Sequence, residues 1–122
     1  MADEPDYEQI ANKIGSESID HLETIIKEED PFVGAKATYL ASLIPSQKSI
    51  NVLKLASQNQ HPEVRVASIF GVTKMANEPT PPTMNLTETH NEAITLLKSL
   101  KNDSDIRVKN EASKSLDAIK NQ

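Results

Sequence analysis

The chain has 122 residues, a net charge of −5, few aromatic residues (3%) and no cysteine. A chain of this length fits one domain. The lack of cysteine excludes disulfides, cysteine-ligated zinc and thiol catalysis, and the negative charge argues against general nucleic-acid binding. The first residues are acidic and polar, and no apolar run reaches membrane-spanning length. We therefore expect a cytoplasmic protein with no membrane and no nucleic-acid partner.

The charge is distributed unevenly along the chain. Residues 1–30 contain ten acidic residues and two lysines, whereas lysine and arginine are in slight excess in the remainder. Solvated faces at the two ends of the molecule are the simplest explanation. The alternative is that the ends recognise something, either another protein or the opposite end of a like molecule.

The first predicted helix is short. Asp6 is a candidate N-cap with Gln9 as its capping-box partner, and Gly15-Ser16 is expected to end the helix. We interpret residues 1–16 as a cap over the first helix pair, because a terminal repeat without a cap would expose its core. Further helices are predicted over 17–28, 31–44, 47–58, 62–77, 89–101 and 104–121.

The segment 78–88 separates the fourth and fifth of these helices. Its three prolines exclude a helix over the first half, and it is long for a connection between helices. It is either a tolerated surface insertion or a docking loop. Thr89 is the predicted N-cap of the next helix, with Glu92 at the capping-box position.

A short phrase recurs three times, each time between two apolar stretches of helical period. Its copies are Asp30-Pro31-Phe32-Val33-Gly34, His61-Pro62-Glu63-Val64-Arg65 and Asp103-Ser104-Asp105-Ile106-Arg107. A helix, a tight turn and a second helix, repeated, is typical of an α-solenoid. We expect the second helices to bury the following residues: Val33, Leu40, Leu43 and Ile44; Val64, Ala67, Phe70, Gly71 and Met75; Ile106, Ala112, Leu116 and Ile119.

The turns themselves carry capping chemistry. Asp30 and Asp103 are predicted N-caps, since an aspartate oxygen there accepts from the first free amides of the helix. His61 is a weaker residue at the same place, followed by Pro62 at the favoured first helical position.

On these turn residues the chain resembles the HEAT-repeat family. In that family an aspartate at the turn and an arginine inside the second helix form a ladder between neighbouring repeats. The resemblance would place Asp30, Asp103, Arg65 and Arg107 in the ladder, with Asp30 meeting Arg65 across one boundary. The first copy departs from the pattern at Gly34 and the second at His61.

The predicted fold class is therefore all-α: a short, armadillo-like α-solenoid of three helix-pair (HEAT-like) repeats with an N-terminal capping helix. The expected divisions of this single domain are 1–16 for the cap, 17–45 for repeat 1, 46–77 for repeat 2, 78–88 for the proline-rich loop and 89–122 for repeat 3.

We find no constellation of residues suited to chemistry. His21, His61 and His90 are not spaced as metal ligands within one helix, no Gly-x-Ser-x-Gly occurs, and the three glycines are isolated. We therefore expect no catalytic residues, no metal, no cofactor and no enzymatic activity.

A second stripe on the same helices is the candidate binding surface. It contains Gly34, Thr38 and Ala41, then Arg65, Ile69 and Val72, then Arg107, Glu111 and Lys114. Ile69 and Val72 are apolar where a solvated helix would be polar. Either they pack on the neighbouring repeat, which a helix apolar all round favours, or they form the centre of a groove. The candidate partner-binding residues are Arg65, Ile69, Val72, Arg107 and Lys114.

The first functional hypothesis is a scaffold or adaptor that binds another protein or a peptide. The alternative is an accessory or assembly factor resembling bilin-lyase-type repeat proteins, which bind a small ligand or its carrier protein. The lack of cysteine and the few aromatic residues argue against a site for a flat conjugated ligand. A nucleic-acid-binding role would need a basic face and is disfavoured by the acidic first repeat.

Overall fold

The computed structural model describes residues 7–28, 30–44, 46–77 and 86–120, with side chains at 17–27, 30–44, 46–77 and 87–119. These residues form six α-helices and no strand. The helices are α1 (Tyr7–Glu28), α2 (Pro31–Ser42), α3 (Gln47–Ala56), α4 (Pro62–Asn77), α5 (Leu86–Leu100) and α6 (Ile106–Lys120).

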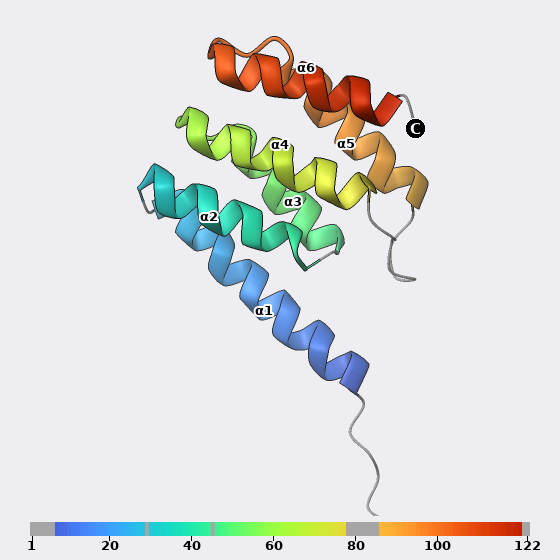
Figure 1. Ribbon diagram of the computed structural model, residues 1–122. Coiled ribbons are helices and arrows are strands. Elements are labelled where there is room, and N and C mark those ends of the chain that lie inside the picture. The colour runs from blue at the N-terminus through green and yellow to red at the C-terminus, as the bar shows by residue number, and fades with distance from the viewer. Residues whose placement is uncertain (1–6, 29, 45, 78–85, 121–122) are drawn as a thin grey trace, which may run out of the picture.

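The helices form two layers (Figure 1). In the front layer α2, α4 and α6 lie side by side, and α1, α3 and α5 lie behind them. The most extensive contact is between α2 and α4, and α4 in turn packs on α6. In the back layer, Lys48 of α3 pairs with Asp20 of α1 at 2.8 Å. Helix α4 is therefore the middle element, with neighbours on two sides and a layer behind it.

Local capping fixes where several helices begin. The Asp30 carboxylate accepts from the amides of Phe32 (2.9 Å) and Val33 (3.1 Å), so the predicted N-cap of α2 is confirmed. Ser46 and Ser49 form a reciprocal capping box at the start of α3. In α6 the cap is Asp105, whose side chain accepts from the Arg107 amide at 2.9 Å. The prediction that Asp103 caps α6 is therefore wrong by two residues.

The predicted bounds of α4 are confirmed, and two other boundaries are corrected. Helix α1 runs without a break through Gly15-Ser16, so there is no separate capping helix before residue 17. A glycine in a right-handed helix costs only about 1 kcal/mol relative to alanine, so a single glycine does not have to end the helix. Thr89 lies inside α5 and is buried, so it is not the N-cap. Residues 78–85, most of the predicted proline-rich loop, lie outside the described part of the chain.

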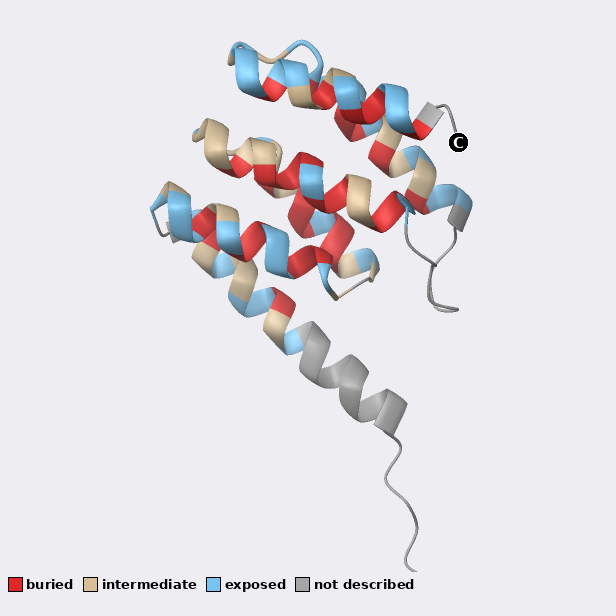
Figure 2. Ribbon diagram, viewed as in Figure 1, coloured by how far each residue is buried: buried red, intermediate tan, exposed pale blue. Residues whose placement is uncertain are grey.

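Buried residues lie along the sides of the helices that face one another (Figure 2), and most of the buried side chains are aliphatic. One cluster joins α1, α2, α3 and the start of α4, and the other joins α3, α4, α5 and α6. Leu53 of α3, Ile69 of α4 and Leu97 of α5 are fully buried at the centre of the second cluster. Helices α3 and α4 contribute residues to both clusters and so connect the two halves of the molecule.

Gly71 is the point of closest approach inside this core. A Cβ atom at this position would lie 2.8 Å from Leu53 Cδ2 and 3.2 Å from the Ser42 Cβ. At Gly34 the nearest atom, Val64 Cγ2, would be 3.3 Å away. Only Gly71 therefore meets two side chains that must both move.

We expect Gly71→Ala to destabilise the fold by about 1 kcal/mol, because overpacking costs about 1–3 kcal/mol while the gain in helix propensity is about 1 kcal/mol. Gly34→Ala is the matched control and should lie within about 0.5 kcal/mol of the wild type by the same balance. Urea unfolding of both variants measures the difference. A Gly71→Ala protein more stable than Gly34→Ala would contradict the close packing.

Candidate functional site

Two of the five candidate binding residues lie in the core. Ile69 has no exposed surface and Val72 is also buried, and both belong to the cluster shared by α3, α4, α5 and α6. On α2, Gly34, Thr38 and Ala41 of the same predicted stripe are buried as well. The interpretation that Ile69 and Val72 pack between helices is confirmed, and the groove interpretation is wrong. The physical reason is that this stripe faces neighbouring helices of both layers: Gly34 lies next to Val64 of α4, and Val72 faces residues of α3 and α5.

The side chain of Arg65 is also mostly buried. Its Nε donates to Asp103 Oδ2 at 2.9 Å and its second guanidinium nitrogen donates to Asp103 Oδ1 at 3.0 Å. The two side chains are only 14% and 10% exposed. The resemblance implied a contact between Asp30 and Arg65, but Arg65 instead reaches forward to the turn between α5 and α6. Arg65 therefore holds helices together and is not available to a partner.

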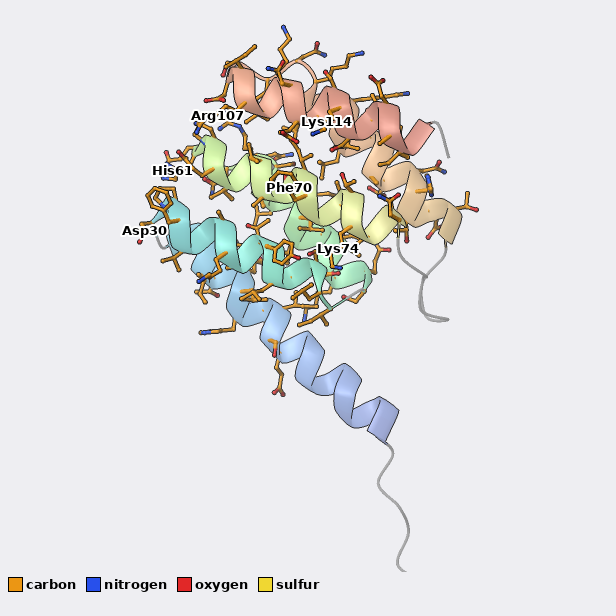
Figure 3. The ribbon with its side chains drawn as sticks, in the orientation of Figure 1. Asp30, His61, Phe70, Lys74, Arg107 and Lys114 are labelled. Atoms are coloured by element: carbon orange, nitrogen blue, oxygen red, sulfur yellow. The ribbon has the colours of Figure 1, made fainter. Side chains whose placement is uncertain are left out.

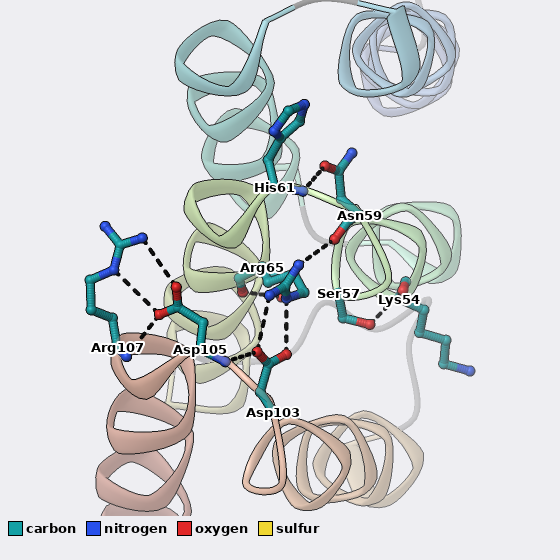
Figure 4. A network of polar contacts seen from close by, with 9 residues as sticks. Lys54, Ser57, Asn59, His61, Arg65, Asp103, Asp105 and Arg107 are labelled. Atoms are coloured by element: carbon teal, nitrogen blue, oxygen red, sulfur yellow. Dashed lines mark hydrogen bonds and ion pairs between the residues drawn. The ribbon is translucent and has the colours of Figure 1, made fainter.

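This ion pair is part of a polar network along the turns (Figure 4). The third Arg65 nitrogen donates to the carbonyl oxygen of Asn59 at 2.8 Å. The side-chain oxygen of Asn59 accepts a hydrogen bond from the His61 amide at 2.9 Å. In the same way, the carboxylate of Asp103 accepts from the Asp105 amide at 2.9 Å. The two turns therefore have the same local geometry and are joined to each other through one arginine.

Arg107 takes part in a more exposed contact at the start of α6. Its guanidinium hydrogen-bonds to the Asp105 carboxylate at 3.3 Å, and this bond lowers the pKa of Asp105 below its ordinary value. A longer contact of 3.7 Å joins Arg107 to Glu63 on α4. The same carboxylates raise the pKa of Arg107, and the hydrogen bond that Arg107 donates to Asp105 is the main cause. Arg107 is thus a surface cation held in place by two neighbouring carboxylates.

The positions of the three front helices can be matched through their first backbone hydrogen bonds. The carbonyl oxygens of Asp30, His61 and Asp105 each accept from the amide four residues on, at 2.8, 3.2 and 3.0 Å. Residues at the same distance after Asp30, His61 and Asp105 occupy corresponding positions on α2, α4 and α6, and we call such a set of three a row. Two rows are considered, two and nine residues after these starting points. The rows are Phe32, Glu63 and Arg107, then Tyr39, Phe70 and Lys114. The contact between Glu63 and Arg107 agrees with this matching.

Exposed aromatic residues occupy the first half of these rows. Phe32 is 77% exposed, Tyr39 45% and Phe70 48%, and the chain contains only four aromatic residues. Toward α6 the rows continue with the exposed cations Arg107 and Lys114. Figure 3 labels Phe70, Arg107 and Lys114 on the front of the molecule. We call these five residues, Phe32, Tyr39, Phe70, Arg107 and Lys114, the aromatic–basic face.

The sequence prediction named Arg107 and Lys114 of this face but missed its three aromatic residues. Phe70 was expected inside and is exposed. The same correction applies to four aliphatic residues: Val33, Leu40, Leu43 and Ile106 are all exposed. Ile106 is exposed because the cap of α6 is Asp105, two residues after the predicted Asp103. Val33, Leu40 and Leu43 are exposed because, among the described residues, no further helix packs on the side of α2 that faces away from α4. The signal that could have revealed the face is the matching of Tyr39 with Phe70, 31 positions apart.

Within the described residues, no three histidine, aspartate or glutamate side chains gather in the manner of a metal site. Among the helices that the structure describes, none combines the length and the apolar character needed to cross a bilayer.

Scans of the chain against protein families, curated proteins and solved structures give no match. The aromatic–basic face is the surface on which the proposed function rests.

Proposed function

We propose that the chain is a non-enzymatic protein-interaction module, a short HEAT-like α-solenoid that acts as a scaffold or adaptor. The paired helices in two layers, the related turns of α3–α4 and α5–α6, and the arginine that joins these turns support this architecture. A stack of helices is suited to presenting a surface, since each pair displays equivalent positions along one face.

The observation that carries the proposal is the exposure of Tyr39 and Phe70 at matched positions, with the exposed Phe32 seven residues before Tyr39 on α2. Exposing large apolar side chains is unfavourable by about 25 cal/mol per Å² of apolar surface. Contiguous apolar patches on a folded domain mark interaction sites, and aromatic residues are the most frequent energetic centres of protein interfaces. An aromatic patch bordered by cations has the composition of such an interface.

The spacing of the face indicates the kind of ligand. Successive rows are separated by seven residues, or about 10 Å along a helix axis, and neighbouring helices are about 8–10 Å apart. A peptide or helix with two apolar anchors about 10 Å apart would cover the aromatic half. Carboxylates beyond those anchors would reach Arg107 and Lys114 on α6. We therefore propose an acidic, amphipathic protein segment as the partner.

The test is selection of binding peptides from a random display library on the immobilised protein. Enriched peptides should combine aliphatic or aromatic residues with aspartate or glutamate. Tyr39→Ser/Phe70→Ser should weaken their binding by at least about tenfold, or 1.4 kcal/mol. The matched control is Val33→Ser/Leu40→Ser, which removes apolar residues of similar exposure from another side of α2.

A control variant that binds as weakly as Tyr39→Ser/Phe70→Ser would place the binding elsewhere on the domain. Enriched peptides that are basic, or no enrichment at all, would also contradict the proposed partner. Circular dichroism melting of each variant is needed beside the binding curves, because a partly unfolded protein loses every ligand.

A further inference from the structure

A second surface lies at the α1–α2 end of the molecule. It is an open hollow of about 630 Å³ between these two helices. Its apolar floor consists of Leu22, Leu40, Leu43 and Ile44, and its polar edge on α1 consists of Glu17, Ser18 and His21. Leu40 and Leu43 are 42% and 47% exposed, so the floor is open to solvent.

Comparison with α4 explains why this side is apolar. Counting from Asp30 and His61, Leu40 corresponds to Gly71 and Val33 corresponds to Val64. Both α4 residues are buried: Val64 lies next to Gly34 of α2, and Gly71 lies between Leu53 of α3 and Ser42 of α2. The corresponding side of α2 has the apolar character of a packed helix face, but no helix covers it among the described residues.

The opposite end of the stack does not have this property. On α6 the positions that correspond to Arg65 and Ile69 are Lys109 and Ser113, which are polar. At these positions the outer side of α6 therefore carries polar residues, whereas the outer side of α2 carries apolar ones. A head-to-tail contact between two copies would place leucines on lysine and serine, which argues against a second copy as the occupant.

The charge beside the hollow distinguishes among other occupants. Glu17 lines the hollow, whereas Asp20 and Glu23 on the same helix are paired with Lys48 and Lys27. Residues 1–30 as a whole carry ten acidic residues against two lysines. An acidic border would repel an acidic ligand and attract a basic one over about 8–10 Å at physiological salt.

We infer that the α1–α2 hollow is a second docking site, which binds a basic amphipathic helix of another protein. Leucine-like anchors at positions i, i+3, i+4 and i+7 would rest on Leu22, Leu40 and Leu43. Lysine or arginine residues beside these anchors would face Glu17. This site lies on another surface than the aromatic–basic face and has the opposite charge preference. The protein would thus join an acidic segment on one face to a basic helix at one end.

The experiment uses the full chain and three synthetic peptides of about 18 residues, long enough to be helical when bound. One peptide has leucines in the helical pattern with lysine elsewhere, the second replaces lysine by glutamate, and the third scrambles the first. Fluorescence anisotropy should give binding of the leucine–lysine peptide at least about tenfold tighter than binding of the other two, a difference of 1.4 kcal/mol.

Two neighbouring residues of α2 provide a matched pair of variants. Leu40→Lys places a cation in the hollow and should weaken binding of the leucine–lysine peptide by at least about tenfold. Tyr39→Lys adds the same charge at a residue of nearly the same exposure, 45% against 42%, on the aromatic–basic face. It should change the affinity by less than about threefold.

Equal losses in the two variants, or equal binding of the glutamate peptide, would overturn the inference. So would a wild-type protein that light scattering finds to be a dimer and Leu40→Lys converts to a monomer, since the occupant would then be a second copy. Because Tyr39→Ser/Phe70→Ser tests the other face, failure at the hollow and failure of the proposed function give different results.

Discussion

Ile69→Asp should leave the chain unfolded at 25 °C. Ile69 is fully buried in the cluster between α3, α4, α5 and α6. A carboxylate at this position would lose its hydration without gaining a partner, and the lost aliphatic contacts alone are worth about 2–5 kcal/mol. A domain of this size is stable by about 5–15 kcal/mol. The expected loss of more than about 4 kcal/mol therefore removes most or all of the stability.

The adjacent residue provides the control for this result. Phe70 is 48% exposed on the front of α4, so Phe70→Asp should change the free energy of unfolding by about 1 kcal/mol or less. Ile69→Val should cost about 1 kcal/mol and remain folded, which allows the packing at this position to be quantified. Circular dichroism melting curves distinguish the three variants. An Ile69→Asp protein that melts near the wild-type temperature would mean that this side of α4 faces solvent.

The parts of the fold that the sequence predicted correctly are governed by local chemistry. The bounds of α4 follow from Pro62 at its start, and Asp30 caps α2 because its carboxylate reaches amides two and three residues away. Interactions of such short range leave a pattern that can be recognised without knowledge of the neighbours. The break predicted at Gly15-Ser16 does not occur, because one glycine costs a helix only about 1 kcal/mol and does not by itself end it.

The faces of the helices depend on neighbours and were predicted less well. Helix α4 carries apolar residues around most of its circumference, including Ile69, Phe70 and Val72. Periodicity therefore could not determine which of them point toward α2, α6 or the back layer. In α2, Leu40 and Leu43 have the character of core residues and are exposed because the helix lies at the end of the stack.

The residue that caps α6 also depends on a distant part of the chain. The segment Asp103-Ser104-Asp105 offers two aspartates, and each can occupy the cap position of the recurring phrase. The structure assigns capping to Asp105 and leaves Asp103 free to accept Arg65. Which aspartate caps the helix and which one pairs with an arginine depends on the position of Arg65, 38 residues earlier in the chain.

Substitution of Arg65 or Asp103 is expected to have the second-largest effect. The paired side chains are 14% and 10% exposed, so either one alone would be a mostly buried charge. Arg65→Ala also removes the bond to the Asn59 carbonyl, and Asp103→Ala removes the acceptor of the Asp105 amide. Each variant should lose about 2–3 kcal/mol in urea unfolding, between the cost of one charged hydrogen bond and that of breaking a fully buried pair.

A double-mutant cycle shows whether this loss belongs to the pair. Arg65→Ala/Asp103→Ala should be less destabilised than the sum of the single variants, with a coupling energy of about 1–3 kcal/mol that persists at high salt. The pair Glu63 and Arg107, which is 34% and 60% exposed, is the matched control and should have a weaker coupling that salt abolishes. Equal coupling in the two cycles would contradict a structural role for Arg65.

The consequence of this ion pair extends to the aromatic–basic face. Arg65 belongs to α4, the helix of Phe70, and Asp103 belongs to the turn that leads into α6, the helix of Lys114. The pair therefore fixes the position of the basic half of the face relative to the aromatic half. If the proposed partner uses both halves, Asp103→Ala should weaken its binding while a folded variant such as Ile69→Val does not. The same substitution should have little effect on the α1–α2 hollow, because none of the residues that line the hollow takes part in the Arg65–Asp103 pair.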